Sequence, residues 1–179
     1  MRKIDRISND NITRKDEIIA FIYECICCVF MGLSLRNWSY IKIFLITLPF
    51  LVIFTLILHE SIHILFFKLF GKNAQIKIIN DNFKNIYIYQ SNENVFYTRL
   101  QTIVILLSPL VLISCLTFLI LQFVNRQLFV PISVNGVINA MGAMTDVILS
   151  LKLLSYKEKI FVNYEKKDYI TLNIFKKEE

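Results

Sequence analysis

The feature that most constrains this chain is a group of polar residues inside a long apolar run. Residues 43–67 are apolar almost throughout, yet they contain His59, Glu60 and His63, which include the only two histidines among the 179 residues. A run of this length can cross a bilayer as a helix, which needs about 20 residues. Ionisable side chains inside such a helix are costly and usually mark a functional site. The chain must therefore fold so that this group is shielded from lipid.

The spacing of these residues is H-E-x-x-H. Residues four apart share one face of an α-helix, so His59 and His63 can bind one metal ion. Glu60 lies about 100° further round the helix than His59, and in this motif the glutamate is a general base. The pattern predicts a zinc centre in which Glu60 is the base and not a ligand.

Three further apolar runs accompany this one. They cover residues 18–35, 100–124 and 128–151, and they explain why 55% of the chain is hydrophobic. The last two are long enough to span a bilayer, whereas the first is short and carries Glu24. The sequence therefore predicts a mainly α, polytopic membrane helical bundle of about four spans, forming a single domain over residues 1–179 with a small β-hairpin or sheet.

Lysine and arginine are distributed unevenly around these runs. If the N-terminus is cytoplasmic, only Arg36, Lys42 and Arg126 fall outside the cell. Because cytoplasmic segments are enriched in Lys and Arg, this asymmetry predicts a multi-pass cell-membrane protein with both termini cytoplasmic. The net charge of +6 is then explained by Lys and Arg at the ends of the spans. We therefore expect no nucleic-acid partner.

Two polar segments alternate in the manner of β-strands. Residues 72–98 contain two alternating stretches around a turn-like Asn80-Asp81-Asn82, and residues 169–175 form a similar stretch. The pattern predicts a hairpin and a further strand, both on the cytoplasmic side and able to pair in one small sheet. Such a sheet either caps the helices or offers an edge to an extended peptide.

The cysteines and the N-terminus suggest no secreted, disulfide-linked protein. Cys25, Cys27 and Cys28 cluster in the first apolar run, and Cys115 lies in the third. We expect them to pack as small apolar side chains, with a metal or redox role as the alternative. The first run starts after 17 mostly polar residues without a cleavage site, so we expect a retained membrane anchor.

A catalytic zinc usually has three protein ligands, so a third must come from elsewhere in the chain. Asp146 is the only ionisable residue in the run 128–151. We count from the outer ends of the two runs, which lie near Pro131 and Lys42. Asp146 lies 15 residues past Pro131, and His59 lies 17 past Lys42. At 1.5 Å per residue, both side chains are then at about the same depth in the membrane. Asp146 is the best candidate on this ground, and Glu24 is its competitor.

The fourth run also has polar and small residues spaced four, three and four apart, namely Asn135, Asn139, Gly142 and Asp146. This spacing places them on one helical stripe. Gly142 is expected to let a neighbouring helix approach closely. The asparagines either orient a histidine or bind a substrate backbone, or they simply bond between helices. Ser108-Pro109 is expected to kink the third run and to free backbone carbonyls. Ser108 is also a candidate to bind substrate or to support the metal ligands.

Together these motifs resemble the Putative zincin peptidase family, a group of small bacterial membrane proteins. The resemblance covers about residues 40–155 and is carried by three motifs: His59-Glu60-x-x-His63 followed by Lys68-Leu69-Phe70-Gly71, Ser108-Pro109, and Asn139-x-x-Gly142-x-x-x-Asp146. The chain is more distantly similar to the site-2 protease class of intramembrane metalloproteases. It departs from that class because Ile62 replaces a common glycine, Val147 follows the aspartate, and no Asn-x-x-Pro precedes it.

The resemblance implies a zinc-dependent, membrane-embedded metallopeptidase that hydrolyses a peptide bond of a peptide or membrane-protein substrate. It implies zinc ligands at His59, His63 and Asp146, a base at Glu60 and substrate binding at Asn139. One alternative is a catalytically inactive metal-binding protein that regulates or chaperones another membrane protein. A transporter or channel subunit is a further alternative, but it would need more spans or an oligomer, and no inverted repeat is visible.

Overall fold

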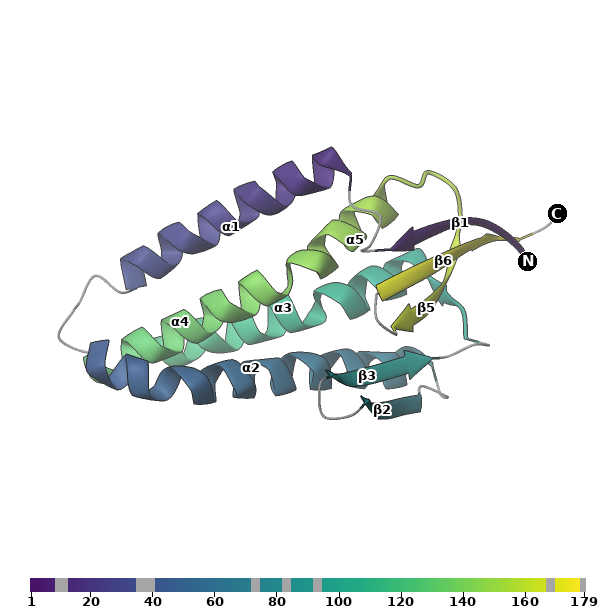
Figure 1. The fold of residues 1–179 in the computed structure, drawn as a ribbon. Coiled ribbons are helices and arrows are strands. Elements are labelled where there is room, and N and C mark those ends of the chain that lie inside the picture. The colour runs from purple at the N-terminus through teal and green to yellow at the C-terminus, as the bar shows by residue number, and fades with distance from the viewer. Residues whose placement is uncertain are drawn as a thin grey trace. The chain divides into compact units, whose positions relative to one another are not determined.

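A computed structural model of the chain describes residues 1–8, 13–34, 41–71, 75–81, 85–91, 95–166 and 170–177 (Figure 1). In this part the chain is mainly helical, with a small antiparallel sheet. It divides into two compact units. The helical unit comprises Arg14–His63 and Leu107–Thr145, and the sheet unit comprises Met1–Thr13, Ile64–Leu106 and Asp146–Glu179.

The described helices are α1 (Arg14–Ser34), α2 (Ile41–Phe70), α3 (Arg99–Leu121), α4 (Arg126–Gly142) and α5 (Met144–Leu154). Two of them, α2 and α3, are long and apolar enough to cross a membrane, and α4 with α5 makes a third if the bent pair counts as one span. Within the described residues α1 does not meet the same test. The structure therefore supports two to three membrane-capable helices, and the fourth span remains a prediction.

The predicted span 128–151 is not one continuous helix. It breaks at Ala143, and the helices on either side are bent by 46°. The N–H of Ala143 is shared among the carbonyls of Asn139, Ala140 and Met141. Gly142 precedes the break, and glycine is a poor helix former because it loses much backbone entropy on ordering.

The expected role of Gly142 in close packing is wrong. Apart from its chain neighbours and the backbone of its own helix, no heavy atom of a described residue lies within 4 Å of where its Cβ would be. The close approach occurs instead at Gly136, where a Cβ would lie 2.9 Å from Cγ2 of Thr117 on α3. Spacing alone could not distinguish the two glycines, because only the neighbouring helix decides which one it contacts.

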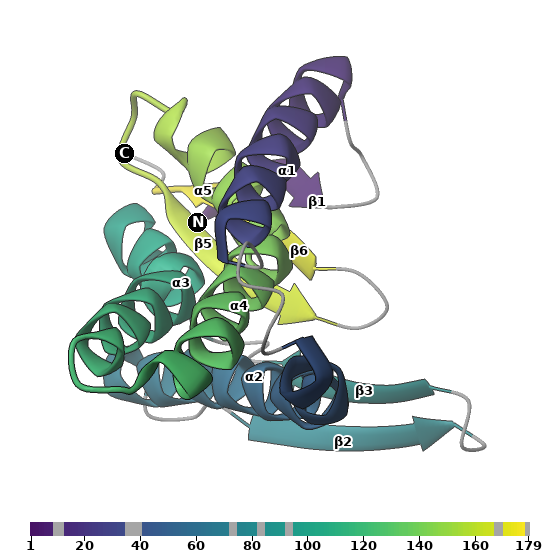
Figure 2. The same ribbon diagram turned by 90° about the vertical axis from the view of Figure 1, so that its left-hand side faces the viewer.

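The helical unit has its apolar surface on the outside. Its helices α2, α3 and α4 run side by side, and α1 lies along α4 (Figures 1 and 2). Large apolar side chains such as Phe50 and Phe118 are 75% and 66% exposed, while polar Thr55 and Asn139 are buried. Such a surface suits a lipid environment, in which the backbone is satisfied within helices and apolar side chains face hydrocarbon.

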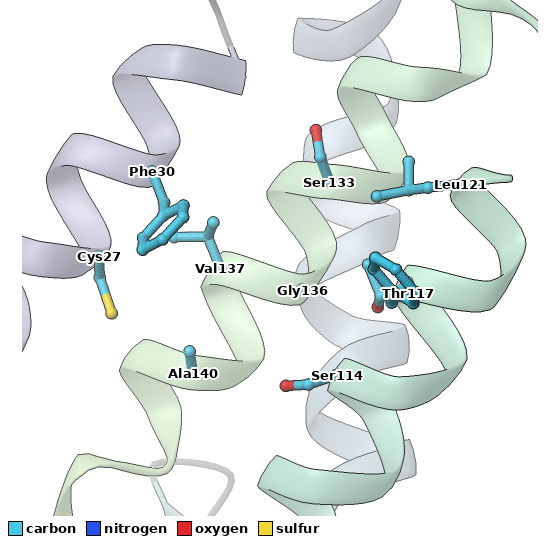
Figure 3. Close-up of a pocket in the computed structure, with 10 residues that line it drawn as sticks. Cys27, Phe30, Ser114, Thr117, Leu121, Ser133, Gly136, Val137 and Ala140 are labelled. Carbon is cyan, nitrogen blue, oxygen red and sulfur yellow. The ribbon is translucent and has the colours of Figure 1, made fainter.

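A cavity of about 410 Å³ opens between α1, α3 and α4 within the helical unit (Figure 3). Its lining is mostly small or apolar and includes Cys27, Phe30, Ser114, Gly136 and Ala140. Cys27 is buried, whereas Cys25, Cys28 and Cys115 are exposed, and all four are free thiols.

The sheet unit contains β1 (Arg2–Ser8), β2 (Gln75–Asp81), β3 (Asn85–Ser91), β4 (Tyr97–Thr98), β5 (Phe161–Lys166) and β6 (Ile170–Lys176). The strands lie in the order β1-β6-β5-β3-β2, and β4 also pairs with β5; every pairing is antiparallel. The predicted hairpin is β2 and β3 (Figure 2), and the predicted tail strand is β6. Asn82 of the expected turn and Tyr169 of the expected tail lie outside the described residues.

Two of the longer strands were not predicted. The N-terminal segment was described only as mostly polar, but it forms β1, in which Ile7 and Ser8 are buried opposite Leu172 and Thr171. The other unpredicted strand, β5, pairs with both β3 and β6 and so joins the hairpin and the tail in one sheet.

The core of the sheet unit is apolar and fully enclosed. Phe67 at the end of α2, Ile105 near the start of α3 and Leu153 on α5 pack against Val162 and Leu172 of the strands. Each of these side chains is at most 3% exposed. This unit therefore has the larger apolar interior, and the helical unit has a smaller buried apolar cluster around Val130 and Val134.

Candidate metal centre

One face of α2 carries the polar residues of the centre. Thr55, His59, His63 and Phe67 follow one another at intervals of four and are 2%, 8%, 6% and 3% exposed. An interval of four keeps side chains on one helical stripe, and the neighbouring Leu56 and Ile57 are exposed. The stripe keeps both histidines away from the exposed apolar surface.

The two imidazoles face each other. His59 Nε2 lies 3.1 Å from His63 Nε2, and the rings meet edge to face with an interplanar angle of 76°. Two nitrogens bound to one tetrahedral zinc at 2.0–2.1 Å lie about 3.3 Å apart. The separation of the Nε2 atoms therefore fits two ligands of a single ion.

Asn139 fixes the tautomer of His59. Its Oδ1 lies 3.0 Å from His59 Nδ1, and its Nδ2 donates to the carbonyl of Pro109 at 3.4 Å. Because the amide nitrogen faces a carbonyl, the amide oxygen faces the imidazole, and an oxygen of this kind only accepts. His59 Nδ1 must then carry the proton, which leaves the lone pair on Nε2 on the side of His63.

A second contact between α2 and α4 lies one turn earlier, where the Thr55 hydroxyl bonds to Asn135. Both contacts join residues 80 positions apart, so α2 and α4 run parallel. Sequence reasoning named both asparagines but missed Thr55. Thr55 lies four residues before His59, so the sequence already indicated that it shares the helical face of the histidines.

Asp146 completes a group of possible metal ligands. Among the described residues, one group of histidine, cysteine or acidic side chains has this geometry: His59, His63 and Asp146, which each offer an atom within 4.8 Å of the others. All three are buried. Asp146 lies in the first turn of α5, where the helix dipole favours a carboxylate. Glu24, the competing candidate, is exposed on α1.

The two remaining predicted site residues, Glu60 and Ser108, lie on different helices and differ in burial. Glu60 is half-buried and follows His59 directly on α2. Ser108 is buried on α3, one residue before Pro109, whose carbonyl receives Asn139. Their assigned roles as general base and as a substrate or supporting residue remain predictions.

The donor set fits zinc. Two neutral imidazole nitrogens and a carboxylate oxygen are ligands that catalytic zinc takes, with a further position left for water or substrate. A hydrogen-bond partner that orients a ligating histidine is also a regular feature of such centres. The group could therefore bind a metal ion of this kind.

The comparison with protein families identifies the class. The model of the Putative zincin peptidase family matches residues 52–161, which include His59, Glu60, His63 and Asp146. The chain belongs to this family. No curated protein and no solved structure is detectably similar to the chain.

Proposed function

We propose that the protein is a zinc-dependent membrane metallopeptidase that hydrolyses a peptide bond in or near the membrane. Family membership supports a peptidase. The observation that carries the proposal is the pair of Nε2 atoms 3.1 Å apart, with Asn139 Oδ1 lying 3.0 Å from the other ring nitrogen of His59. In this proposal His59, His63 and Asp146 hold the zinc.

The chemistry divides between the ion and the chain. When bound, zinc would lower the pKa of water to about 7 and would polarise a carbonyl. Glu60 takes the proton from the attacking water and delivers it to the leaving amine, which separates the two halves of the peptide. Its half-buried position beside two buried histidines suits a base that must reach both water and substrate.

The membrane setting is also proposed. Two to three helices can span a bilayer, and the uneven distribution of Lys and Arg favours cytoplasmic termini. The substrate is a peptide or a membrane protein whose backbone becomes locally unwound, because an intact helix already uses its backbone groups. Reporter fusions at Lys84 and at Arg126 should then report opposite sides of the membrane.

The test is a metal and activity analysis of the detergent-purified protein. The wild type should hold about one zinc per chain, and Asp146→Ala should lose it. Glu60→Gln keeps the size of the side chain and removes the basic carboxylate, so it should retain zinc and lose about 10²–10⁴-fold in turnover. Turnover is measured on a membrane-embedded peptide that the wild type cleaves.

Each outcome separates the alternatives. Zinc in the wild type without any cleavage would favour the inactive metal-binding protein. Full zinc retention in Asp146→Ala would place the third ligand elsewhere. Loss of zinc in Glu60→Gln would make this residue a ligand. Near-wild-type turnover of that variant would exclude Glu60 as the base.

A further inference from the structure

The first helix contributes a polar contact to the helix that carries Asn139. The hydroxyl of Tyr23 on α1 donates to the carbonyl of Ala140 on α4 at 2.6 Å. Both residues belong to the helical unit, and they are 117 positions apart in the chain. Ala140 directly follows Asn139, which orients His59.

This carbonyl lies where α4 ends. The N–H of Ala143 is shared among the carbonyls of Asn139, Ala140 and Met141, and its separation from the Ala140 oxygen is 3.2 Å. Three acceptors that share one donor are each weakly bonded, and carbonyls in an apolar setting need donors. The Tyr23 hydroxyl supplies a full donor at the shorter distance.

Tyr23 lies on the narrow face with which α1 meets α4. Among residues 14–31 of α1, whose burial the structure describes, the buried or half-buried residues lie at helical intervals of three or four: Asp16, Ala20, Tyr23, Cys27 and Met31. The side chains around them, such as Phe21 and Ile22, are 67% and 54% exposed. Figure 3 shows the continuation of this face, where Cys27 and Phe30 lie beside Val137 and Ala140 of α4.

We propose that Tyr23 is a positioning residue for the metal centre. By bonding the end of α4 it holds the turn that contains Asn139, and Asn139 in turn holds the tautomer and orientation of His59. The inference rests on the proposed zinc function. It assigns to α1 a role in that function beyond membrane anchoring. The helix supplies the hydrogen bond from Tyr23 to Ala140, the neighbour of Asn139, and Asn139 contacts His59.

The test compares zinc affinities of purified variants by competition with a chelator. Removal of a group that orients a ligand weakens metal binding about 10–100-fold, and we expect this of Asn139→Ala. Tyr23 bonds the carbonyl of Ala140, the residue after Asn139, so its effect on the metal ligands should be less direct and smaller. We expect Tyr23→Phe, which keeps the ring, to weaken zinc binding about fivefold. Tyr156→Phe is the matched control, because it removes a hydroxyl that bonds Asp5 in the sheet unit; its zinc affinity should equal that of the wild type.

A double-mutant cycle distinguishes positioning from general stability. If Tyr23 acts through Asn139, Tyr23→Phe should weaken binding less than twofold when Asn139→Ala is already present. In an Asn135→Ala background the fivefold loss should persist, because Asn135 contacts Thr55 and not a histidine. Amide hydrogen exchange of the metal-free protein should also quicken at residues 141–144 in Tyr23→Phe.

The outcomes that overturn the inference are specific. If the wild type binds zinc and Tyr23→Phe binds it equally well, Tyr23 has no positioning role, while the proposed function stands. A loss that is fully additive with Asn139→Ala would also refute it. If the wild type takes up no zinc, the proposed function fails and the positioning role fails with it.

Discussion

The helical unit and the sheet unit differ in the size of their apolar interiors. In the helical unit Phe50 and Phe118 are exposed, and the buried face of α2 carries Thr55 and His59. In the sheet unit the interior is formed by residues such as Leu172, with surface positions such as Lys157 exposed. The two units therefore differ in how much of their apolar surface they bury, although Leu69 and Leu100 of the sheet unit are also exposed.

The helical unit also shows how the two histidines of the candidate centre are accommodated. In a lipid-facing bundle, ionisable groups must be turned inward and given partners. His59 meets this need through His63 and Asn139. Burial of hydrogen-bonded polar groups such as His59 and Thr55 is therefore the expected arrangement on a helix whose other faces are apolar and exposed.

The largest expected effect comes from the core of the sheet unit. Leu172→Ala removes a fully buried side chain and should lower the free energy of unfolding by about 2–5 kcal/mol. Leu116→Ala on α3 is the matched change, because Leu116 is 48% exposed; it should cost under about 1 kcal/mol. Unfolding in detergent followed by circular dichroism measures both. Equal losses would mean that the two units do not differ in how they use apolar side chains.

The second prediction tests the exposed surfaces. Val111→Asp places a charge on the exposed face of α3 and should raise the apparent free energy of membrane insertion of that helix by about 3 kcal/mol. Lys157→Asp, at an exposed position of the sheet unit, should leave membrane integration unchanged. Glycosylation mapping in microsomes measures insertion. If Val111→Asp inserts as readily as the wild type, the exposed face of α3 does not contact lipid.

The smallest expected effect concerns a polar contact in the sheet unit. The hydroxyl of Tyr156 donates to the carboxylate of Asp5, and burial, followed by this bond, raises the pKa of Tyr156 above its ordinary value. Tyr156→Phe should lower the free energy of unfolding by about 1 kcal/mol near neutral pH.

The pH dependence of this contact has a definite sign. Because the folded-state pKa is raised, the contribution is fully present below about pH 10, the ordinary pKa of tyrosine, and is lost as the pH rises through the raised value. The difference between wild type and Tyr156→Phe should therefore stay constant from about pH 7 to 9 and shrink above about pH 10. Denaturant unfolding at a series of pH values measures it, and a difference that grows with pH would contradict the bond.

Several features of the fold were accessible from local sequence. The alternation in 72–98 and 169–175 predicted strands that the structure contains as β2, β3 and β6. By contrast, β1 was missed because its sequence is mostly charged, and its pairing partner β6 lies at the other end of the chain. The broken helix at Ala143 was also missed, because the apolar run continues through it without any change in composition.

The sequence by itself determined that His59 and His63 share a helical face, because a spacing of four and the geometry of the α-helix are enough to place them there. It also determined the apolar character of α2 and α3, which follows from composition alone. Only the tertiary structure decided that Asn139 orients His59, that Gly136 and not Gly142 meets a neighbouring helix, and that Tyr23 bonds the end of α4. These contacts join residues tens of positions apart, and no local periodicity specifies which side chains then meet.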